Sequence, residues 1–196
     1  MIFSPSGTYG WNIESSQGLI ESEGTDFSNF PVPSSGDENN SPEKSNFGPG
    51  KGYYWCDLDG TLPRTAVKSG LDKDGGKLYV GRAIHEGEMH PAKIVPNHEC
   101  AYISFCGEEI RKDEYEFLCS GSCVTAWEAC EGGLVPYNAV VGGYTSENEK
   151  LYIGRVFHDG TLTPGKIQPS REGCLIPYGG EELLFSSYEV LILHND

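Results

Sequence analysis

The sequence is short of positive charge. It has 14 lysines and arginines against 29 aspartates and glutamates, which gives a net charge of −15. A protein that binds nucleic acid needs an excess of basic residues to neutralise phosphates, and anionic membrane surfaces attract basic segments for the same reason. We therefore expect no nucleic-acid partner, and the negative charge favours neutral or cationic partners.

Long apolar runs are also missing. No run approaches the roughly 20 residues that a membrane-spanning helix needs, so we expect no membrane insertion. The first seven residues contain neither the basic region nor the apolar region of a secretory signal. We therefore predict a cytoplasmic location, with export by a non-conventional route as the alternative.

The cysteines do not form a recognisable framework. Seven are present, an odd number, and only Cys100 and Cys174 nearly correspond between the two halves described below. This pattern is typical of reduced thiols in an intracellular protein. Cys119 and Cys123 have a spacing that zinc tolerates, but the chain lacks a second matching pair, so we predict no metal site.

An internal duplication is the main feature that the sequence does have. The run K-L-Y-V-G-R-A-I-H-E-G-E-M-H-P-A-K-I at Lys77–Ile94 returns as K-L-Y-I-G-R-V-F-H-D-G-T-L-T-P-G-K-I at Lys150–Ile167, 73 positions later and without a gap. A recurrence of this length indicates two copies of one structural unit.

The duplication suggests three segments: a first repeat at 53–123, a second at 124–196, and a low-complexity arm and linker at 1–52. Within the arm, residues 31–52 are rich in Pro, Ser, Gly and Asn and have little apolar surface to bury. The 26 glycines and 12 prolines of the chain favour many turns and short strands over long helices.

Each repeat shows about five short apolar runs that we interpret as strands. We expect Leu78 and Val80 on one face of their strand and Tyr79 on the other, because side chains alternate along a strand. Glu86-Gly87 supplies a tight hairpin. Two such units have small cores and would bury their apolar faces against each other, so we predict an all-β fold of antiparallel strands with pseudo-twofold symmetry. The expected strands are 65–69, 77–84, 89–95, 100–105 and 115–119, then 138–141, 151–157, 162–167, 174–178 and 188–193, with a charged connection at 107–113.

Taken together, the repeated motifs resemble one family. The order is a Trp, then P-x-x-A-V-x-x-G, then L-Y-[VI]-G-R-x-x-H-x-G-x-[ML]-x-P-x-K, then G-x-E-x-x-x-x-x-Y-E-x-L. It is similar to the DM-nine repeat family, which includes mannose-binding lectins of bivalves and natterin-like proteins. The resemblance extends over Trp55–Leu193, most of the chain outside the arm.

The resemblance implies a carbohydrate site. In the lectin members an acidic residue after the A-[VI]-x-x-G strand and the lysine of P-x-K hold mannose. These positions correspond to Asp72 and Lys93 here. In the second repeat the lysine is kept as Lys166, but Thr145 stands at the acidic position, so a second equivalent site is in question. Glu147 is a nearby substitute.

The chemistry of these groups suits a sugar. A carboxylate accepts two hydroxyl hydrogens and an ammonium donates up to three hydrogen bonds, and such charge-assisted bonds are strong. We expect Asp72 and Lys93 to balance each other's charge in the empty site. The alternative is an Asp that caps its turn and a Lys that is solvated at a strand edge. The residue of the second repeat that corresponds to Glu88 is Thr161, which is not acidic. We therefore predict that Glu88 serves only a first-repeat site.

Other repeated residues are assigned to structure. We expect Arg82 and Arg155 to pair with carboxylates such as Glu109 and Glu182. The tryptophans that open the repeats, Trp55 and Trp127, anchor the core in our interpretation, with stacking on a sugar as the alternative. His85 and His158 precede hairpin glycines, and neither repeat offers a matching Ser or Cys nucleophile. We therefore expect no enzyme activity and no cofactor.

The function that we predict is a mannose-type lectin that recognises glycans on pathogens. The lectin relatives are dimers, so the resemblance implies a homodimer. The alternative is an intracellular protein, vesicle-associated or structural, that has no sugar affinity. A pore-forming role is not expected, because the first 50 residues are too polar to form a membrane hairpin.

Overall fold

The computed structural model describes residues 52–57 and 60–194. The predicted N-terminal arm lies outside the described residues, apart from its last position. Within the described ranges, no helix is long and apolar enough to cross a membrane.

The described chain is built from strands. Two short 3₁₀ turns, Pro96–His98 and Pro169–Arg171, follow equivalent strands, as the duplication requires. The strands are β1 (Tyr53–Asp57), β2 (Lys68–Leu71), β3 (Lys77–His85), β4 (Glu88–Val95), β5 (Cys100–Phe105), β6 (Glu108–Lys112), β7 (Glu116–Ser120), β8 (Val124–Glu131), β9 (Val141–Tyr144), β10 (Lys150–His158), β11 (Thr161–Gln168), β12 (Gly173–Tyr178), β13 (Glu181–Phe185) and β14 (Ser187–His194).

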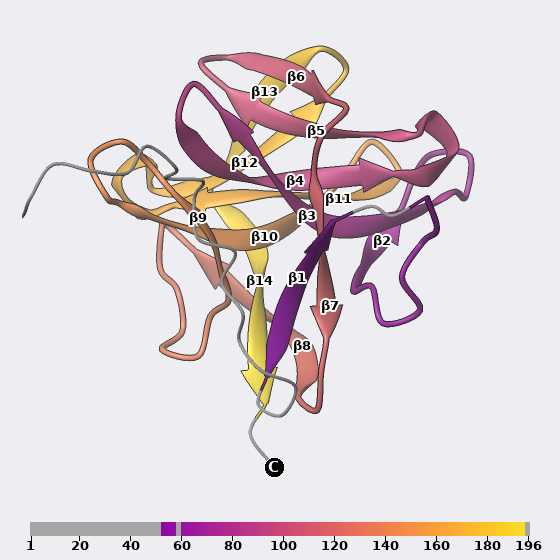
Figure 1. Cartoon of the computed structure of the whole chain (residues 1–196). Coiled ribbons are helices and arrows are strands. Elements are labelled where there is room, and N and C mark those ends of the chain that lie inside the picture. The colour runs from indigo at the N-terminus through magenta and orange to yellow at the C-terminus, as the bar shows by residue number, and fades with distance from the viewer. Residues whose placement is uncertain (1–51, 58–59, 195–196) are drawn as a thin grey trace, which may run out of the picture. The chain divides into compact units, whose positions relative to one another are not determined.

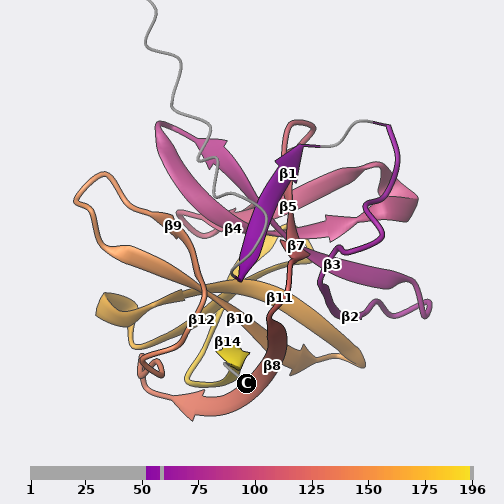
Figure 2. The ribbon, with the colours of Figure 1, turned by 60° about the horizontal axis from the view of Figure 1, so that its bottom comes forward.

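The strands form one antiparallel network whose order reads the same from both ends. The order is β1-β7-β3-β4-β5-β6-β13-β12-β11-β10-β14-β8, with β2 beside β3, and β9 beside both β10 and β4. Each strand of the first repeat stands as many places from the β6–β13 junction as its counterpart in the second repeat does. Figures 1 and 2 show β3, β4, β10 and β11 crossing the middle of this unit. The predicted all-β fold with pseudo-twofold symmetry is confirmed.

Contacts across the junction are reciprocal, which is the mark of a twofold axis. The Glu109 amide donates to the Gly180 carbonyl over 3.1 Å, and the Glu182 amide donates to the Gly107 carbonyl over 3.0 Å. The four residues are related by the 73-residue offset. The axis therefore passes between β6 and β13.

Three apolar clusters hold the unit together. One belongs to the first repeat and one to the second, while the third takes residues from both. The shared cluster consists of three equivalent pairs: Val67 and Val140, Val80 and Ile153, Leu118 and Leu191. Because both repeats contribute to it, each repeat completes the core of the other.

The local predictions were partly right. The Glu86-Gly87 hairpin is present, with both residues at positive φ (49° and 82°), as a two-residue type I′ turn requires. The predicted alternation in β3 is confirmed, because Tyr79 (6% exposed) and Val80 (1%) pack into different apolar clusters, so both faces of the strand are buried. The charged stretch 107–113 was predicted as a connection, but most of it forms β6, which lies at the junction between the repeats.

Candidate functional site

Two buried lysines mark equivalent sites on β4 and β11. Lys93 is 9% exposed and Lys166 is 4% exposed. A buried ammonium needs a carboxylate and further hydrogen bonds to offset the loss of hydration. The network around these two side chains therefore indicates how each site is built.

Each lysine joins the two repeats. The Lys93 ammonium lies 2.7 Å from Oε1 of Glu109 and donates to the Pro177 carbonyl over 2.7 Å. The Lys166 ammonium lies 3.0 Å from Oε1 of Glu182 and donates to the Ser104 carbonyl over 2.6 Å. In both cases the carboxylate comes from the lysine's own repeat and the carbonyl from the other.

The carboxylates of these pairs also cross the axis. Oε2 of Glu109 accepts a hydrogen bond from the Gly180 amide (2.8 Å), and Oε2 of Glu182 accepts one from the Gly107 amide (3.0 Å). The prediction that Asp72 balances the charge of Lys93 was therefore wrong, because Glu109 does so. The reason is burial: an ammonium at this depth pairs with the carboxylate that β6 places beside it.

The predicted partners of the two arginines were also wrong. Arg82 pairs with Glu116, and Arg155 pairs with Glu189 over 2.7 Å. Each arginine also lies over a tryptophan ring. The Arg82 guanidinium is 4.3 Å from the centre of Trp55, and the equivalent distance from Arg155 to the second-repeat tryptophan is 4.1 Å. These cation–π contacts support the assignment of arginines and tryptophans to structure.

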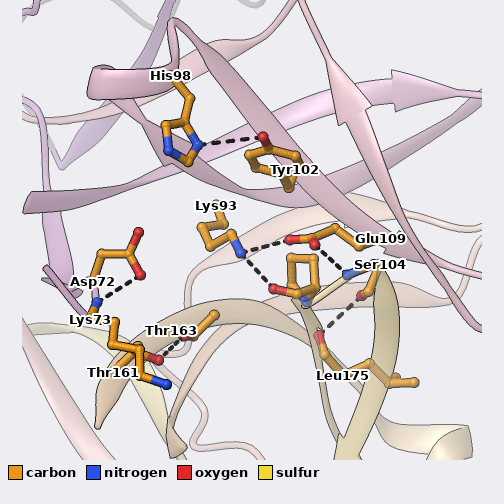
Figure 3. A network of polar contacts seen from close by, with 12 residues as sticks. Asp72, Lys73, Lys93, His98, Tyr102, Ser104, Glu109, Thr161, Thr163 and Leu175 are labelled. Atoms are coloured by element: carbon orange, nitrogen blue, oxygen red, sulfur yellow. Dashed lines mark hydrogen bonds and ion pairs between the residues drawn. The ribbon is translucent and has the colours of Figure 1, made fainter. Parts of the chain in front are cut away.

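The acidic residue of the first site lies in the turn after β2. The Asp72 amide donates to the Gly76 carbonyl over 2.7 Å, and Oδ1 of Asp72 accepts a hydrogen bond from the Lys73 amide over 2.8 Å. Figure 3 shows the Asp72 carboxylate turned toward the side where Lys93 lies. No ion pair joins these two side chains in the described part of the chain.

Asp159 and Tyr178 of the second repeat lie beside this first site. Lys73 pairs with Asp159 over 2.8 Å, and the Tyr178 hydroxyl donates to the same Asp159 oxygen over 2.8 Å. The hydrogen bond from Lys73 lowers the pKa of Asp159, and the hydrogen bond to Asp159 raises the pKa of Tyr178. Two aromatic rings flank the buried ammonium, since Lys93 Nζ is 5.1 Å from the ring centre of Tyr102 and 6.0 Å from that of Tyr178.

The second site is a pocket of about 270 Å³ around Lys166. This volume is just below the roughly 300–1,000 Å³ of pockets for drug-sized ligands, and it suits a ligand of about one sugar ring. The pocket also takes residues from both repeats: Glu88, His90 and Phe105 from the first, and Thr145, Glu147, Glu149, Lys166 and Glu182 from the second.

Glu88 and His90 lie on adjacent sides of this pocket. Oε1 of Glu88 accepts a hydrogen bond from the Ser146 amide over 2.7 Å. Hydrogen bonding from the side chain and then from the backbone of Ser146 lowers the pKa of Glu88. His90 is 1% exposed, and neither of its ring nitrogens has a hydrogen-bond partner among the described residues. Its Nε2 lies 3.2 Å from Oε2 of Glu88, but the two groups are not aligned as a hydrogen bond. Burial, assisted by the nearby charge of Lys166, lowers the pKa of His90 to about 4.

The four predicted site residues thus divide between two sites. Asp72 and Lys93 belong to the first, and Lys166 and Glu88 to the second. The prediction that Glu88 serves a first-repeat site was wrong, because β4 carries its side chain across the axis to Lys166. Glu147, which was suggested as the acidic residue of the second site in place of Thr145, lines the same pocket.

Sequence reasoning missed most of the residues that each repeat contributes to the site of the other. At the second site it assigned Glu88 to the wrong site and missed His90. It also missed Thr161 and Thr163, which stand 73 positions after these two residues. Figure 3 shows both threonines in the same view as Lys93 and Asp72. The constant offset identifies these positions as equivalent, but it does not show that they cross to the opposite repeat.

The thiols and histidines do not form a metal centre. All seven cysteines lie in the described part of the chain, and no disulfide joins any of them. Across residues 52–57 and 60–194, no group of three or more His, Cys, Asp or Glu side chains is arranged to hold a metal ion.

Comparison with known proteins identifies a family and one relative in sequence. The DM9 repeat family matches this chain over residues 72–185. Natterin-3 of Thalassophryne nattereri is 27% identical over 152 residues, which cover 73% of this chain and 36% of that protein. The chain therefore spans about a third of the length of this relative.

A solved structure shares the fold. The nematode sperm cell motility protein MFP2B is similar with a TM-score of 0.52, over 72% of this chain and 46% of that one, at 14% sequence identity. At this identity the similarity concerns the arrangement of strands alone.

Proposed function

Because this chain belongs to the DM9 repeat family, we propose that it is a lectin that binds mannose-type glycans at the site of Asp72 and Lys93. Recognition of glycans on pathogen surfaces is the biological role that we propose with it. The observation that carries the proposal is the arrangement of the first site. Four groups surround one region, namely the Asp72 carboxylate, the buried Lys93 ammonium and the rings of Tyr102 and Tyr178.

The hydrogen-bonding capacity of these groups fits a vicinal diol. An ammonium has three hydrogens, and Lys93 uses two of them, on Glu109 and on the Pro177 carbonyl. The third is available to a sugar oxygen. The Asp72 carboxylate holds only the Lys73 amide among the described residues, so it can accept hydrogen bonds from hydroxyl groups. The tyrosine rings offer apolar surface to the carbon face of a pyranose.

The ion pair with Glu109 contributes to binding indirectly. It fixes the position of the Lys93 ammonium before the sugar arrives, together with the Pro177 carbonyl. A fixed donor loses little conformational freedom on binding, and this preorganisation improves affinity. The same arrangement holds Lys166 in the second site.

Two sites in one chain would favour glycans with several sugar units. Linked sites gain avidity when one ligand or surface engages both. We propose that Lys166 and Glu88 form the second, and that a homodimer doubles the number of sites. Agglutination of mannose-coated particles would follow from the two Asp72–Lys93 sites of such a homodimer.

The test is binding of methyl α-mannoside, measured by isothermal titration calorimetry. Asp72→Asn should weaken binding about tenfold or more, because it replaces a charge-assisted hydrogen bond with a neutral one. The matched control is Asp74→Asn in the same turn, where Asp74 accepts a hydrogen bond from the Gly76 amide. This control should leave the affinity within about twofold.

Two results would count against the proposal. One is a wild-type protein that gives no heat with mannoside and is not retained on a mannose matrix. The other is an equal loss of affinity in Asp72→Asn and Asp74→Asn, which would assign the effect to the turn and not to a contact with sugar. Thermal melting of both variants checks that they are folded.

A further inference from the structure

We propose that the Lys166 pocket selects a ligand that carries a protonated amino group beside hydroxyl groups, the chemistry of an amino sugar. The first site takes the neutral hexose. This inference deepens the proposed function, since it assumes that the chain binds sugars, and it assigns different ligand classes to the two sites. It is carried by the composition of the pocket and by one buried side chain within it.

The two sites differ at the positions that cross the axis. Glu88 and His90 line the Lys166 pocket. The equivalent residues of the other repeat are Thr161 and Thr163, which the pseudo-twofold symmetry assigns to the first site. The two threonine hydroxyls are joined by a contact of 2.6 Å, and Thr161 also donates to the His158 carbonyl over 2.9 Å. They satisfy each other and carry no charge. The first site thus has no counterpart of the Glu88 carboxylate or of the His90 imidazole.

The lining of the Lys166 pocket is acidic overall. Four carboxylates line it against two cationic side chains, which leaves two net negative charges: Glu88, Glu147, Glu149 and Glu182 against Lys166 and Arg171. Lys166 is already neutralised by Glu182. Arg171 makes no ion pair among the described residues. Since the charge of the lining is not balanced from within, a cationic ligand is attracted and an anionic one is repelled.

His90 provides the second, independent indication of a ligand. It is buried, it lines the pocket, and both of its ring nitrogens lack hydrogen-bond partners among the described residues. Buried polar groups nearly always have a partner. A neutral imidazole has one accepting nitrogen and one donating nitrogen. It can therefore accept a hydrogen bond from an ammonium or donate one to a hydroxyl oxygen.

Glu88 completes the recognition of the amino group. Its Oε1 is held by the Ser146 amide, and its Oε2 lies 3.2 Å from His90 Nε2. A ligand ammonium that lies to one side of this pair of atoms would donate a hydrogen bond to each. The Ser146 contact fixes the carboxylate, so the site needs little rearrangement on binding.

The test compares three methyl glycosides: those of glucosamine, glucose and N-acetylglucosamine. At about pH 6 an aliphatic amine is protonated and His90 is still neutral. Titrations followed by imidazole ¹H–¹⁵N spectra report on the Lys166 pocket, because His90 lies in it. We expect the glucosaminide to bind about tenfold more tightly than the other two and to shift the His90 signals, with the preference weakened by salt.

The natural difference between the sites supplies the matched variants. E88T/H90T gives the second site the residues of the first, and calorimetry should show the amine preference lost. T161E/T163H makes the reverse exchange and should create a preference at the first site. Glu88→Gln, which keeps the shape of the side chain, serves if the double variant does not fold, and it should reduce the preference about fivefold or more.

The outcomes separate this proposal from the proposed function. Mannoside binding that depends on Asp72, with no glucosaminide preference, overturns the amine assignment alone. A glucosaminide preference that disappears in E88T/H90T, without mannoside binding, supports the amine site and overturns the neutral site. A preference that survives in both E88T/H90T and Glu88→Gln overturns the amine assignment, because the ligand would then be bound elsewhere. Failure of all three glycosides and of the mannoside overturns both.

Discussion

The two lysine sites are built on the same frame and filled differently. In both, a buried lysine on an equivalent strand pairs with a carboxylate of its own repeat and donates to a carbonyl of the other. The residues that line the two sites are not equivalent in charge, since two threonines of one correspond to a glutamate and a histidine of the other. The frame and the lining therefore depend on different positions of the repeat.

This difference shows how a duplicated fold can acquire two specificities. The lysine–glutamate pair cannot vary freely, because it holds the junction between β6 and β13 through the Gly107 and Gly180 amides. The residues at the start of β4 and β11 are not part of that junction. Substitutions there change the site and leave the frame intact. Three predictions test this separation, from the largest expected effect to the smallest.

The largest effect is expected at the more buried ion pair. The side chains of Lys166 and Glu182 are 5% and 3% exposed, against 11% and 12% for Lys93 and Glu109. Lys166→Met should lower the free energy of unfolding by about 4 kcal/mol, because it leaves a buried carboxylate without its partner. Lys93→Met should cost less. Urea denaturation measures both.

A double variant checks the cause of that loss. K166M/E182Q removes the isolated charge and keeps an oxygen that can accept the Gly107 amide. It should recover most of the stability, since replacing both partners of a buried pair is often nearly neutral. If the double variant is as unstable as Lys166→Met, lost packing and not the unpaired charge is responsible.

A smaller effect is expected where the two repeats approach most closely. A Cβ on Gly143 would lie 1.8 Å from the Met89 carbonyl oxygen, and one on Gly70 would lie 2.0 Å from the Leu162 carbonyl oxygen. These contacts are related by the pseudo-twofold axis. Gly143→Ala and Gly70→Ala should each cost about 3 kcal/mol of unfolding free energy, because backbone must move to admit the methyl group.

The matched control for these glycines is Gly87→Ala. Gly87 has a positive φ of 82°, but no atom lies within 4 Å of an added Cβ. Only backbone strain of about 1 kcal/mol is expected there. Equal losses at Gly87 and at the two close contacts, measured by urea denaturation, would show that the close approach of the repeats is not rigid.

The smallest effect concerns pH and distinguishes the linings. Burial lowers the pKa of His90 to about 4 from an ordinary value of 6.5. Between these values the unfolded chain binds more protons at this residue than the folded chain, so stability falls as the pH is lowered from 6.5 toward 4. At about pH 5 this histidine should account for a loss of about 2 kcal/mol relative to pH 7 and above.

His90→Thr, which introduces the residue found at the equivalent position, isolates that contribution. Wild type and variant should differ in the slope of unfolding free energy against pH between about 6.5 and 4. Lys166, which lowers the pKa of His90, and Glu88, which raises it, remain in the variant and continue to contribute. Parallel curves would show that His90 is not held neutral by the fold.

The sequence by itself determined the repeat and its consequences. The constant offset of 73 residues identified two copies of one β unit, and the few short strands of each unit predicted that each would need the other to bury its core. The structure confirms this in the shared cluster, where Val80 and Ile153 are equivalent. The hairpin turn was also predictable, because Gly87 readily adopts the positive φ that the second position of a type I′ turn requires. These features are local, or they depend only on composition and periodicity.

Only the tertiary structure decided which residues share a site. Asp72 with Lys93 was predicted from a resemblance, whereas the position of Glu88 beside Lys166 was not predicted at all. The charged stretch that forms β6 was also missed, because its own residues show little apolar alternation; it pairs with β5 along its length and with β13 of the other repeat at Glu108. The physical reason is the twofold axis. It brings together positions that are far apart in sequence, and a repeat read along the chain shows which positions are equivalent but not which ones meet.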